Sequence, residues 1–442
     1  MAEVRYKTIV DALAARIRKG ELKPGDRLPT VRAMMLLHGI ALATAARVYD
    51  ELEVIGLVVG EGGRGTFVRD LTLARGAGMA HRPARVGVLD LTFSYPTLPG
   101  QDAMLREGFR SLAGLGDLDA LLHSAPPSGR PHEREMIARH LRNRGLRVTG
   151  DEVIIVSGAQ HGLAVATMAL LKPGDVLAVD ALTYPGMLAL ARAHRLDIES
   201  LPLTAAGTDL DALARLCKRR AVRAVYSMPT MHNPLGLVMP EPNRIQLAGL
   251  AEHHDFLIIE DATYAFLAEP APRPIQTHAP ERTVYVSSLS KSVAAGLRVG
   301  FVVAPPALLP LLEQAVRTTT WQASSVPVAL ACHWIESGVV DALEDRKRRD
   351  ARSRQRLASR VLRDCAVVAH PSSYYLWLGL AQGSRADRVA AELAQQGVLV
   401  TTAESFAATR HAPQALRLAL GALSLEALGS ALISINAVVA SE

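Results

Sequence analysis

The chain has 442 residues, of which 49% are apolar, and it carries 49 Lys and Arg against 43 Asp and Glu. The length corresponds to roughly three ordinary domains, and the composition excludes a disordered or collagen-like chain. No apolar run reaches the ~18 residues of a membrane helix, and the first ten residues lack the apolar segment of a signal peptide. The three cysteines, Cys217, Cys332 and Cys365, are too far apart to predict a zinc site or a disulfide framework. We therefore expect a cytoplasmic protein without a metal site or membrane association.

The positive charge is concentrated near the N-terminus. Residues 1–87 hold 14 Lys and Arg against 9 Asp and Glu, whereas residues 88–442 hold 35 against 34. A basic segment ahead of a neutral one indicates where a polyanion would bind. Ordinary solvation of a protein surface would account for the same excess, so charge alone does not decide between the two.

The first seventy residues predict three short helices and a hairpin. The first helix is indicated by apolar residues three and four positions apart and ends at Gly20; they are Tyr6, Ile9, Val10, Leu13 and Ile17. Thr30 is the expected N-cap of a second helix over 31–37. A third helix fits 41–55, and 57–69 reads as strand, turn and strand around glycines. This order is typical of a winged helix-turn-helix.

The same residues carry a family resemblance. GELKPGDRLPTVRAM, ARVYDELEVIGLV and GGRGTFV resemble the DNA-binding domain of the GntR family of bacterial regulators over residues 4–69. The resemblance implies that the third helix enters the major groove of DNA and that the wing follows the backbone or minor groove. Arg32, Thr44 and Arg47 would then face DNA, with Arg64 at the tip of the wing.

The expected recognition helix departs from the family pattern. Ala41, Leu42, Ala43 and Ala46 stand where polar residues are common in the family. Such side chains offer bases only apolar contact, chiefly with thymine methyl groups. A winged helix kept only as an interaction module is therefore the alternative to a DNA-reading domain.

Residues 71–87 are predicted to form a linker, because they hold small residues, a proline and three arginines without periodicity. From residue 88 onward, continuous apolar runs such as EVIIVSG, VLAVD and FLIIED alternate with amphipathic segments. This alternation predicts an α/β domain whose mainly parallel sheet is covered on both faces by helices.

Polar motifs follow directly on the predicted strands, where open α/β sheets bind ligands. VSGAQHG presents the turn Ser157, Gly158, Ala159 and Gln160 at the start of a helix, which suits a phosphate. ALTYPG places Tyr184 where its ring would stack on a flat ligand or fill the core.

Three further motifs carry hydrogen-bonding and charged groups. MPTMHNPLG offers Asn233, and IIEDATY offers Asp261 and Tyr264. SSLSKSVAAGLRVG holds Ser288, Ser290, Lys291 and Arg298. Each motif is weak by itself, since a lone lysine is usually solvated.

In this order and spacing, the five motifs resemble the fold type I pyridoxal-phosphate enzymes, the aspartate aminotransferase superfamily. The resemblance implies that Lys291 forms a Schiff base with pyridoxal 5'-phosphate and that Asp261 keeps the ring nitrogen protonated. Asn233 and Tyr264 would contact the phenolate oxygen, and Tyr184 would stack on the ring.

The remaining groups would bind anions. The resemblance assigns Ser288, Ser290, Arg298 and the turn Ser157–Gln160 to the cofactor phosphate, and Arg417 to a ligand carboxylate. Two positions depart from the family: the loop before Gly129 has His123 as the nearest substitute for a tyrosine, and Leu235 replaces the usual threonine.

A winged helix fused to an aminotransferase-like body resembles the MocR subfamily of GntR regulators. The resemblance implies three parts: a DNA-binding domain over 1–70, a linker over 71–87, and over 88–442 a pyridoxal-phosphate-binding domain with a smaller C-terminal subdomain. We expect a homodimer whose DNA binding responds to pyridoxal phosphate or an amino-acid-like effector, and the resemblance implies an exchange of heads between subunits, which is common in the subfamily. The alternative is an active aminotransferase that carries an inherited head.

Overall fold

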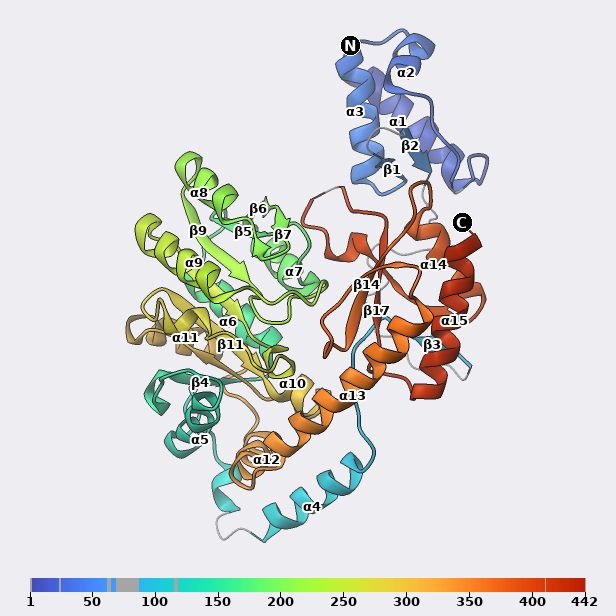
Figure 1. Cartoon of the computed structure of the whole chain (residues 1–442). Coiled ribbons are helices and arrows are strands. Elements are labelled where there is room, and N and C mark those ends of the chain that lie inside the picture. Colours follow the sequence, from blue (N-terminus) through green and yellow to red (C-terminus); the bar gives the residue numbers. More distant parts are fainter. Residues whose placement is uncertain are drawn as a thin grey trace.

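The computed structural model describes residues 2–23, 25–61, 65–68, 87–114, 118–409 and 411–441. Figure 1 shows a two-lobed body and a small N-terminal head that sits beside the C-terminal lobe. The predicted class, an α/β body with a winged-helix head, is confirmed. Arg64 and residues 71–86 lie outside the described residues.

In its described residues the head contains three helices and a two-stranded antiparallel hairpin. Its elements are α1 (Ala2–Arg18), α2 (Val31–His38), α3 (Leu42–Val54), β1 (Val58–Glu61) and β2 (Gly65–Val68). Thr30 caps α2 as the sequence predicts, since its Oγ1 accepts a hydrogen bond from the Ala33 amide at 3.2 Å. Apolar side chains of α1, including Ile9 and Leu13, pack with Val48 and Leu52 of α3 to form the core of the head.

The large lobe is built on a sheet in which seven strands of the described chain pair side by side. In spatial order they are β4 (Val153–Val156), β12 (Gly300–Val303), β11 (Thr283–Ser288), β10 (Leu257–Asp261), β9 (Val222–Ser227), β5 (Val176–Asp180) and β6 (Asp197–Leu201). All neighbouring strands are parallel except β12, which is antiparallel to β11 and β4.

Both faces of this sheet are buried. Ile154 and Val156 of β4 belong to one apolar cluster, whereas Val153 and Ile155 belong to another. Because successive side chains of a strand point to opposite faces, two clusters require cover on both sides. The helices of this lobe (Figure 1) are α5 (Pro131–Arg142), α6 (Ala159–Leu170), α7 (Pro185–Ala193), α8 (Leu210–Arg219), α9 (Glu241–His254), α10 (Leu289–Ser292), α11 (Leu309–Thr319) and α12 (Ser325–Glu336).

The small lobe has an antiparallel sheet of β13 (Ala366–Val368), β14 (Tyr375–Gly379), β17 (Ala415–Ala419) and β16 (Thr401–Thr402). Its helices are α14 (Ala386–Gln395) and α15 (Leu425–Ser441). The long helix α13 (Val339–Val361) runs from the large lobe to this one, and α4 (Gln101–Ala113) lies along the outside (Figure 1).

Short elements complete the body. The strand β3 (Leu89–Asp90) pairs in parallel with β15 (Val398–Leu399), and β7 (Leu203–Thr204) pairs with β8 (Gly207–Thr208). The 3-10 helices are Asp119–Leu122, Gly150–Glu152, Ala265–Leu267, Ile275–Thr277, Ala295–Leu297, Pro306–Leu308 and Ala403–Phe406.

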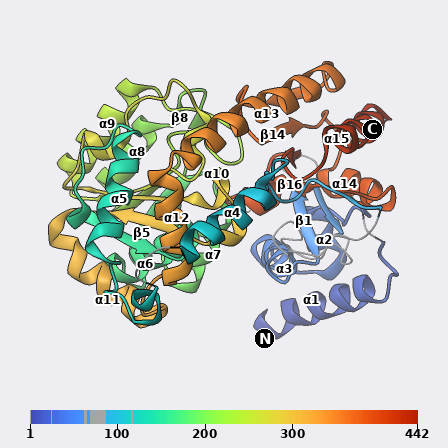
Figure 2. The ribbon, with the colours of Figure 1, turned by 90° about the horizontal axis from the view of Figure 1, so that it is seen from below.

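The head contacts the small lobe next to α14. The guanidinium of Arg385, which precedes α14, lies 5.1 Å from the ring centroid of Phe67 in β2. Figure 2 shows the same neighbourhood from below. The head is therefore placed against the lobe that also carries β17.

Across the described ranges, no single helix is both long and apolar enough to span a membrane. Two sharply bent helix pairs, α2 with α3 and α12 with α13, pass that test together by length and composition.

Candidate active site

One pocket lies at the carboxyl ends of the large-lobe strands, where the small lobe faces them. It is lined by most of the predicted cofactor residues, namely Ala159, Gln160, Tyr184, Asn233, Asp261, Tyr264, Ser288, Ser290, Lys291 and Arg298, and by Arg417. Residues far apart in the sequence thus meet because each follows, or lies in, a strand that ends at this edge.

Lys291 lies in the short helix α10, directly after β11. Its Nζ donates a hydrogen bond to the carbonyl of Ser94 at 2.8 Å. The same nitrogen is 4.9 Å from the ring centroid of Tyr95 and 5.7 Å from that of Tyr264. The amine is therefore held inside the pocket, where an aldehyde carbon would reach it.

Asp261 is buried at the end of β10. Its Oδ1 accepts hydrogen bonds from the amide and hydroxyl of Thr263 at 3.0 and 2.6 Å, and its Oδ2 accepts one from the Tyr226 hydroxyl at 2.8 Å. Burial raises the pKa of Asp261, while these hydrogen bonds act in the opposite direction. A protonated ring nitrogen would supply the positive partner that this buried carboxylate lacks.

The predicted phosphate cradle is formed by the turn between β4 and α6. Gly158 has a φ of +88°, and a Cβ there would lie 2.8 Å from Nη2 of Arg298, so this position requires glycine. Nη2 of Arg298 donates to the Ser157 carbonyl at 3.0 Å. No side chain caps α6 at its N-terminus, which leaves amide groups available to an anion.

Several buried polar atoms of the pocket have no partner among the described residues. They are the hydroxyls of Ser288 and Ser290 and the Oδ1 of Asn233. Unpaired buried polar groups cost free energy, and all three face the pocket that the phosphate and ring oxygens of pyridoxal phosphate would occupy. The residues present therefore fit this cofactor.

Tyr184 and Gln160 are joined to each other beside the cradle. The Tyr184 hydroxyl donates to Oε1 of Gln160 at 2.9 Å. On the other side of the pocket, the ring of Tyr264 packs edge-on against Tyr375, with 5.2 Å between ring centroids. These contacts fix the two tyrosines as walls of the pocket.

Arg417 approaches the pocket from β17 of the small lobe. Its side chain is 5% exposed, and its guanidinium carbon lies 5.2 and 5.7 Å from the ring centroids of Tyr375 and Phe406. Nη1 donates to the Thr92 carbonyl at 2.8 Å, whereas Nε has no partner among the residues described. Burial lowers the pKa of this guanidinium. The geometry suits a carboxylate, which would satisfy the remaining donors.

Two features of the site have no signal in the sequence. Thr92, Phe93, Ser94 and Tyr95 line the pocket, and the hydrogen bonds that Thr92 and Ser94 accept from the cations run through main-chain carbonyls, which every residue has. Lys347 stands in the charged run DRKRRDARSR, which reads as a solvated helix face.

Lys347 is instead fully buried behind Lys291. Its Nζ donates to the carbonyls of Lys291 and Val293, each at 2.9 Å. Burial, and after it the charge of Lys291, lowers the pKa of Lys347 to about 7.

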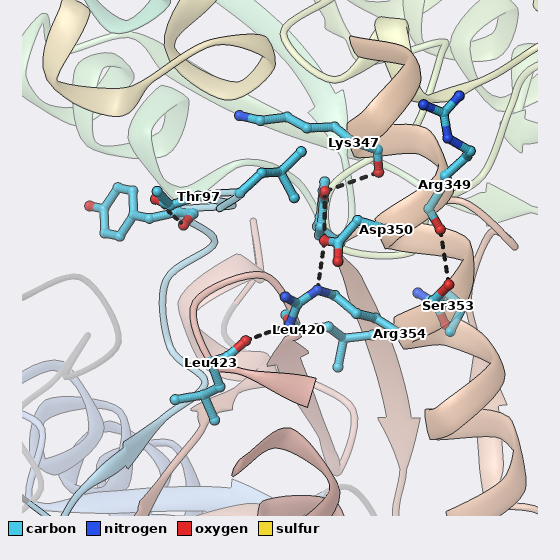
Figure 3. A network of polar contacts seen from close by, with 12 residues as sticks. Thr97, Lys347, Arg349, Asp350, Ser353, Arg354, Leu420 and Leu423 are labelled. Carbon is cyan, nitrogen blue, oxygen red and sulfur yellow. Dashed lines mark hydrogen bonds and ion pairs between the residues drawn. The ribbon is translucent and has the colours of Figure 1, made fainter. Parts of the chain in front are cut away.

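Figure 3 shows that Lys347 begins a chain of polar contacts along α13. The Tyr374 hydroxyl donates to the Lys347 carbonyl and to Asp350 at 3.0 and 2.9 Å. Arg354 donates to Asp350 at 2.7 Å and to the carbonyls of Leu420 and Leu423 at 2.7 and 2.6 Å. Since these last two residues follow β17, the chain connects the Lys291 segment to the strand of Arg417.

The predicted DNA-facing residues are distributed over the head. Arg32 is exposed on α2, and Thr44 is half-buried near the start of α3. The guanidinium of Arg47 lies 4.4 Å from the ring centroid of Tyr6 in α1, so it is held by a contact within the head.

Two positions of the body depart from the family pattern. His123 is exposed and pairs with Asp119 at 3.2 Å, outside the pocket. Leu235 packs in a small apolar cluster.

Comparisons with known proteins agree with this two-part architecture. Residues 88–435 match the family model for aminotransferase class I and II, and residues 5–68 match that for bacterial regulatory proteins of the gntR family. The HTH-type transcriptional regulator YjiR of Escherichia coli is 30% identical over 67% of this chain and 68% of its own. The probable rhizopine catabolism regulatory protein MocR of Rhizobium meliloti is 26% identical over 80% and 76%.

The fold of the body is also that of solved aminotransferases. The kynurenine aminotransferase of Pyrococcus horikoshii superposes with a TM-score of 0.76 over 83% of this chain and 96% of its own, at 21% identity.

The burial of Lys347 predicts a pH effect on stability. Between pH 7 and the ordinary lysine pKa near 10.5, the unfolded chain holds a proton that folded Lys347 has lost. Stability from this residue therefore rises with pH across that window, by up to about 1.4 kcal/mol per unit. We expect Lys347→Met to lose this rise in thermal unfolding at pH 7 and pH 9. Lys172→Met, at an exposed lysine, is the control, and equal pH responses of Lys347→Met and wild type would contradict the assignment.

Proposed function

The chain belongs to the MocR subfamily of GntR-type transcriptional regulators, in which a winged helix-turn-helix is joined to an aminotransferase-like domain, and on this basis we propose how its two parts work together. Pyridoxal phosphate bound at Lys291, alone or after reaction with an amino-acid-like effector, changes the affinity of the head for DNA. The observation that carries this proposal is the convergence of Lys291, Asp261, Arg298 and Arg417 on one pocket.

The cofactor assignment is supported by the chemistry of the pocket. When bound, pyridoxal phosphate supplies an aldehyde that combines with amines and a ring that withdraws electrons. Lys291 offers the amine, Asp261 a buried carboxylate for the ring nitrogen, and Arg298 a guanidinium beside the glycine turn. The unpaired hydroxyls of Ser288 and Ser290 complete the set of donors for a phosphate.

The effector is proposed to carry a single carboxylate and an amine. Of the cations that line the pocket, Lys291 and Arg298 are assigned to the cofactor, which leaves Arg417 for the ligand. Among the lining residues described, no further cation remains for a second carboxylate. An amino acid with an uncharged side chain therefore fits better than a dicarboxylic one.

DNA is the partner of the head. The N-terminal end of α3 is exposed at Ala41, Leu42 and Ala43, and Ala41 makes no side-chain cap. A helix that enters the major groove with this end would offer free amides to phosphates and apolar contacts to thymine methyl groups. Arg32, exposed on α2, adds a cation to the surface of the head.

A homodimer is proposed through the outer face of the large lobe. Exposed apolar side chains gather there on α4, on the following 3-10 helix and before α12: Leu105, Phe109, Leu118, Leu122 and Trp321. The amide of Ala125 donates to Gln322, which ties the stretch after this 3-10 helix to the stretch before α12. Exposed apolar surface marks a protein interface where it is contiguous.

An active aminotransferase would use the same four groups, so this pocket by itself fits either role. We propose a regulator rather than an aminotransferase because relatives named as transcriptional regulators match most of this chain.

Replacement of Lys291 tests the regulatory proposal. With a duplex from upstream of its own gene at fixed salt, we expect pyridoxal phosphate to change the apparent Kd of the wild-type protein at least about fivefold. We expect no such change for Lys291→Ala, and a wild-type response for the control Lys172→Ala. A cofactor response that persists in Lys291→Ala would refute the proposal. Sustained transamination at about 1 s⁻¹, without any effect of pyridoxal phosphate on DNA binding, would favour the aminotransferase alternative.

Arg417 is expected to decide the response to amino acids. In protein loaded with pyridoxal phosphate and titrated with a panel of L-amino acids, Arg417→Gln should weaken the spectral response about 10- to 100-fold, since charge-assisted hydrogen bonds are lost. The affinity for pyridoxal phosphate itself should stay within about twofold. Arg192→Gln, at an exposed arginine of α7, serves as the matched control. Equal titration curves for Arg417→Gln and wild type would remove Arg417 from the ligand site.

The dimer surface is tested by one charged substitution. Leu122 is 83% exposed, so Leu122→Asp should leave the fold intact and shift the protein toward monomer in size-exclusion chromatography with light scattering. Ile245→Asp, on α9 at 53% exposure, is the matched control and should not alter the mass. A dimer of unchanged stability in Leu122→Asp would exclude this face as the interface.

A further inference from the structure

Residues 92–95, here called the strap, cross the pocket between the two lobes. The strap follows β3 and the buried Leu91, so it is the first part of the body to enter the site after the segment that joins the head. At its start, the amide of Thr92 donates to Asp90 at 2.8 Å. The strap lies outside the five sequence motifs that predicted the site.

The strap is bonded to both ligand-binding cations through its main chain. The carbonyl of Thr92 accepts from Nη1 of Arg417, and that of Ser94 accepts from Nζ of Lys291, each at 2.8 Å. Two residues of extended chain span about 7 Å. The strap therefore bridges the group assigned to a carboxylate and the group assigned to the cofactor aldehyde.

The side chains of the strap add a second hold on Lys291. The rings of Phe93 and Tyr95 are stacked with 5.7 Å between centroids and 15° between planes. Nζ of Lys291 lies 4.9 Å from the Tyr95 centroid, within the range of a cation–π contact. The positive charge of Lys291 is thus shared between the Ser94 carbonyl and the Tyr95 ring.

Ser94 itself is poorly held by its side chain. It is buried, and its hydroxyl has no hydrogen-bond partner among the residues that the structure describes. An unpaired buried hydroxyl costs free energy, so Ser94 contributes to the attachment of the strap through its main-chain contact with Lys291.

Attachment of pyridoxal phosphate changes the donor on which the strap depends. Lys291, having given its ammonium proton to solvent, adds its amine nitrogen to the aldehyde carbon, a carbon–nitrogen double bond forms, and one water leaves. No oxidant or reductant is needed. An ammonium carries three donor hydrogens, whereas the nitrogen of the product carries at most one. The lysine nitrogen thereby loses at least two of the three donor hydrogens that it offers to the Ser94 carbonyl, and Tyr95 loses the ammonium on its ring.

We propose that the strap is a sensor of the state of Lys291, released when the cofactor attaches and recaptured when an amine frees the lysine. This inference rests on the proposed function and specifies how the site regulates the head. The strap is joined to β17 as well, because the Ala419 amide donates to the Leu91 carbonyl at 2.8 Å. Its release therefore acts on the lobe that contacts the head and, through β3, on the segment that leads to it.

Hydrogen–deuterium exchange on the full-length protein tests the proposal. With pyridoxal phosphate, peptides of the cradle around 157–162 and 286–299 should gain protection, whereas a peptide covering 90–97 should exchange several-fold faster. Lys291→Met, which cannot donate to Ser94, should show fast exchange of 90–97 with and without cofactor. Lys172→Met should behave as the wild type.

Two results would overturn the proposal. One is protection of 90–97 together with the cradle when the cofactor binds, and the other is wild-type exchange of 90–97 in Lys291→Met without cofactor. DNA affinity measured on the same samples separates this failure from that of the proposed function. A cofactor effect on DNA binding without release of the strap would reject the strap alone. Release of the strap without any effect on DNA would reject its role as a signal together with the proposed function.

Discussion

The pocket of this protein is organised around cations whose partners are mainly backbone carbonyls. Lys291, Arg298 and Arg417 line the pocket with Asp261 as the one carboxylate among the described lining residues, and each cation donates to a carbonyl, of Ser94, Ser157 and Thr92 respectively. A carbonyl satisfies a donor without neutralising its charge, so the pocket keeps a positive potential. Under the proposed function, this potential favours a phosphate and a carboxylate in the pocket.

Hydrogen bonds from cationic side chains to backbone carbonyls also connect the two lobes. Because Lys347 is buried among carbonyls of the Lys291 segment, and because Arg354 on the same helix is bonded to carbonyls after β17, α13 fixes the distance between the cofactor lysine and the lobe of Arg417. The head rests on that lobe through Phe67 and Arg385. A ligand influences the head only if it binds two arrangements of the lobes and the head with different affinity. The contact of the strap with Lys291 is proposed to differ between these two arrangements.

Much of the fold and of the candidate site was predictable from the sequence, and the features that were not predictable have physical reasons. Lys291, Asp261 and Gly158 stand in local motifs at strand ends, where burial patterns show the strand and a polar residue marks its end. Arg385 and Phe67 meet across the fold, and the hydrogen bonds of the strap with the cations run through carbonyls, so neither contact leaves a trace in residue types. Lys347 was hidden in a run of charges, since periodicity does not tell a buried lysine from a solvated one. Arg47 stays a predicted DNA-facing residue, and its contact with the ring of Tyr6 in α1 had no signal in the sequence.

The central claim is a coupling free energy between the pocket and the head, and its most direct test is reciprocity. We would measure the affinity of the full-length protein for pyridoxal phosphate, free and saturated with the duplex from upstream of its own gene. Linkage requires that DNA change the Kd for the cofactor by the same factor by which the cofactor changes the Kd for DNA. The account predicts equal factors that differ from one. An affinity for pyridoxal phosphate that is indifferent to saturating DNA would contradict it.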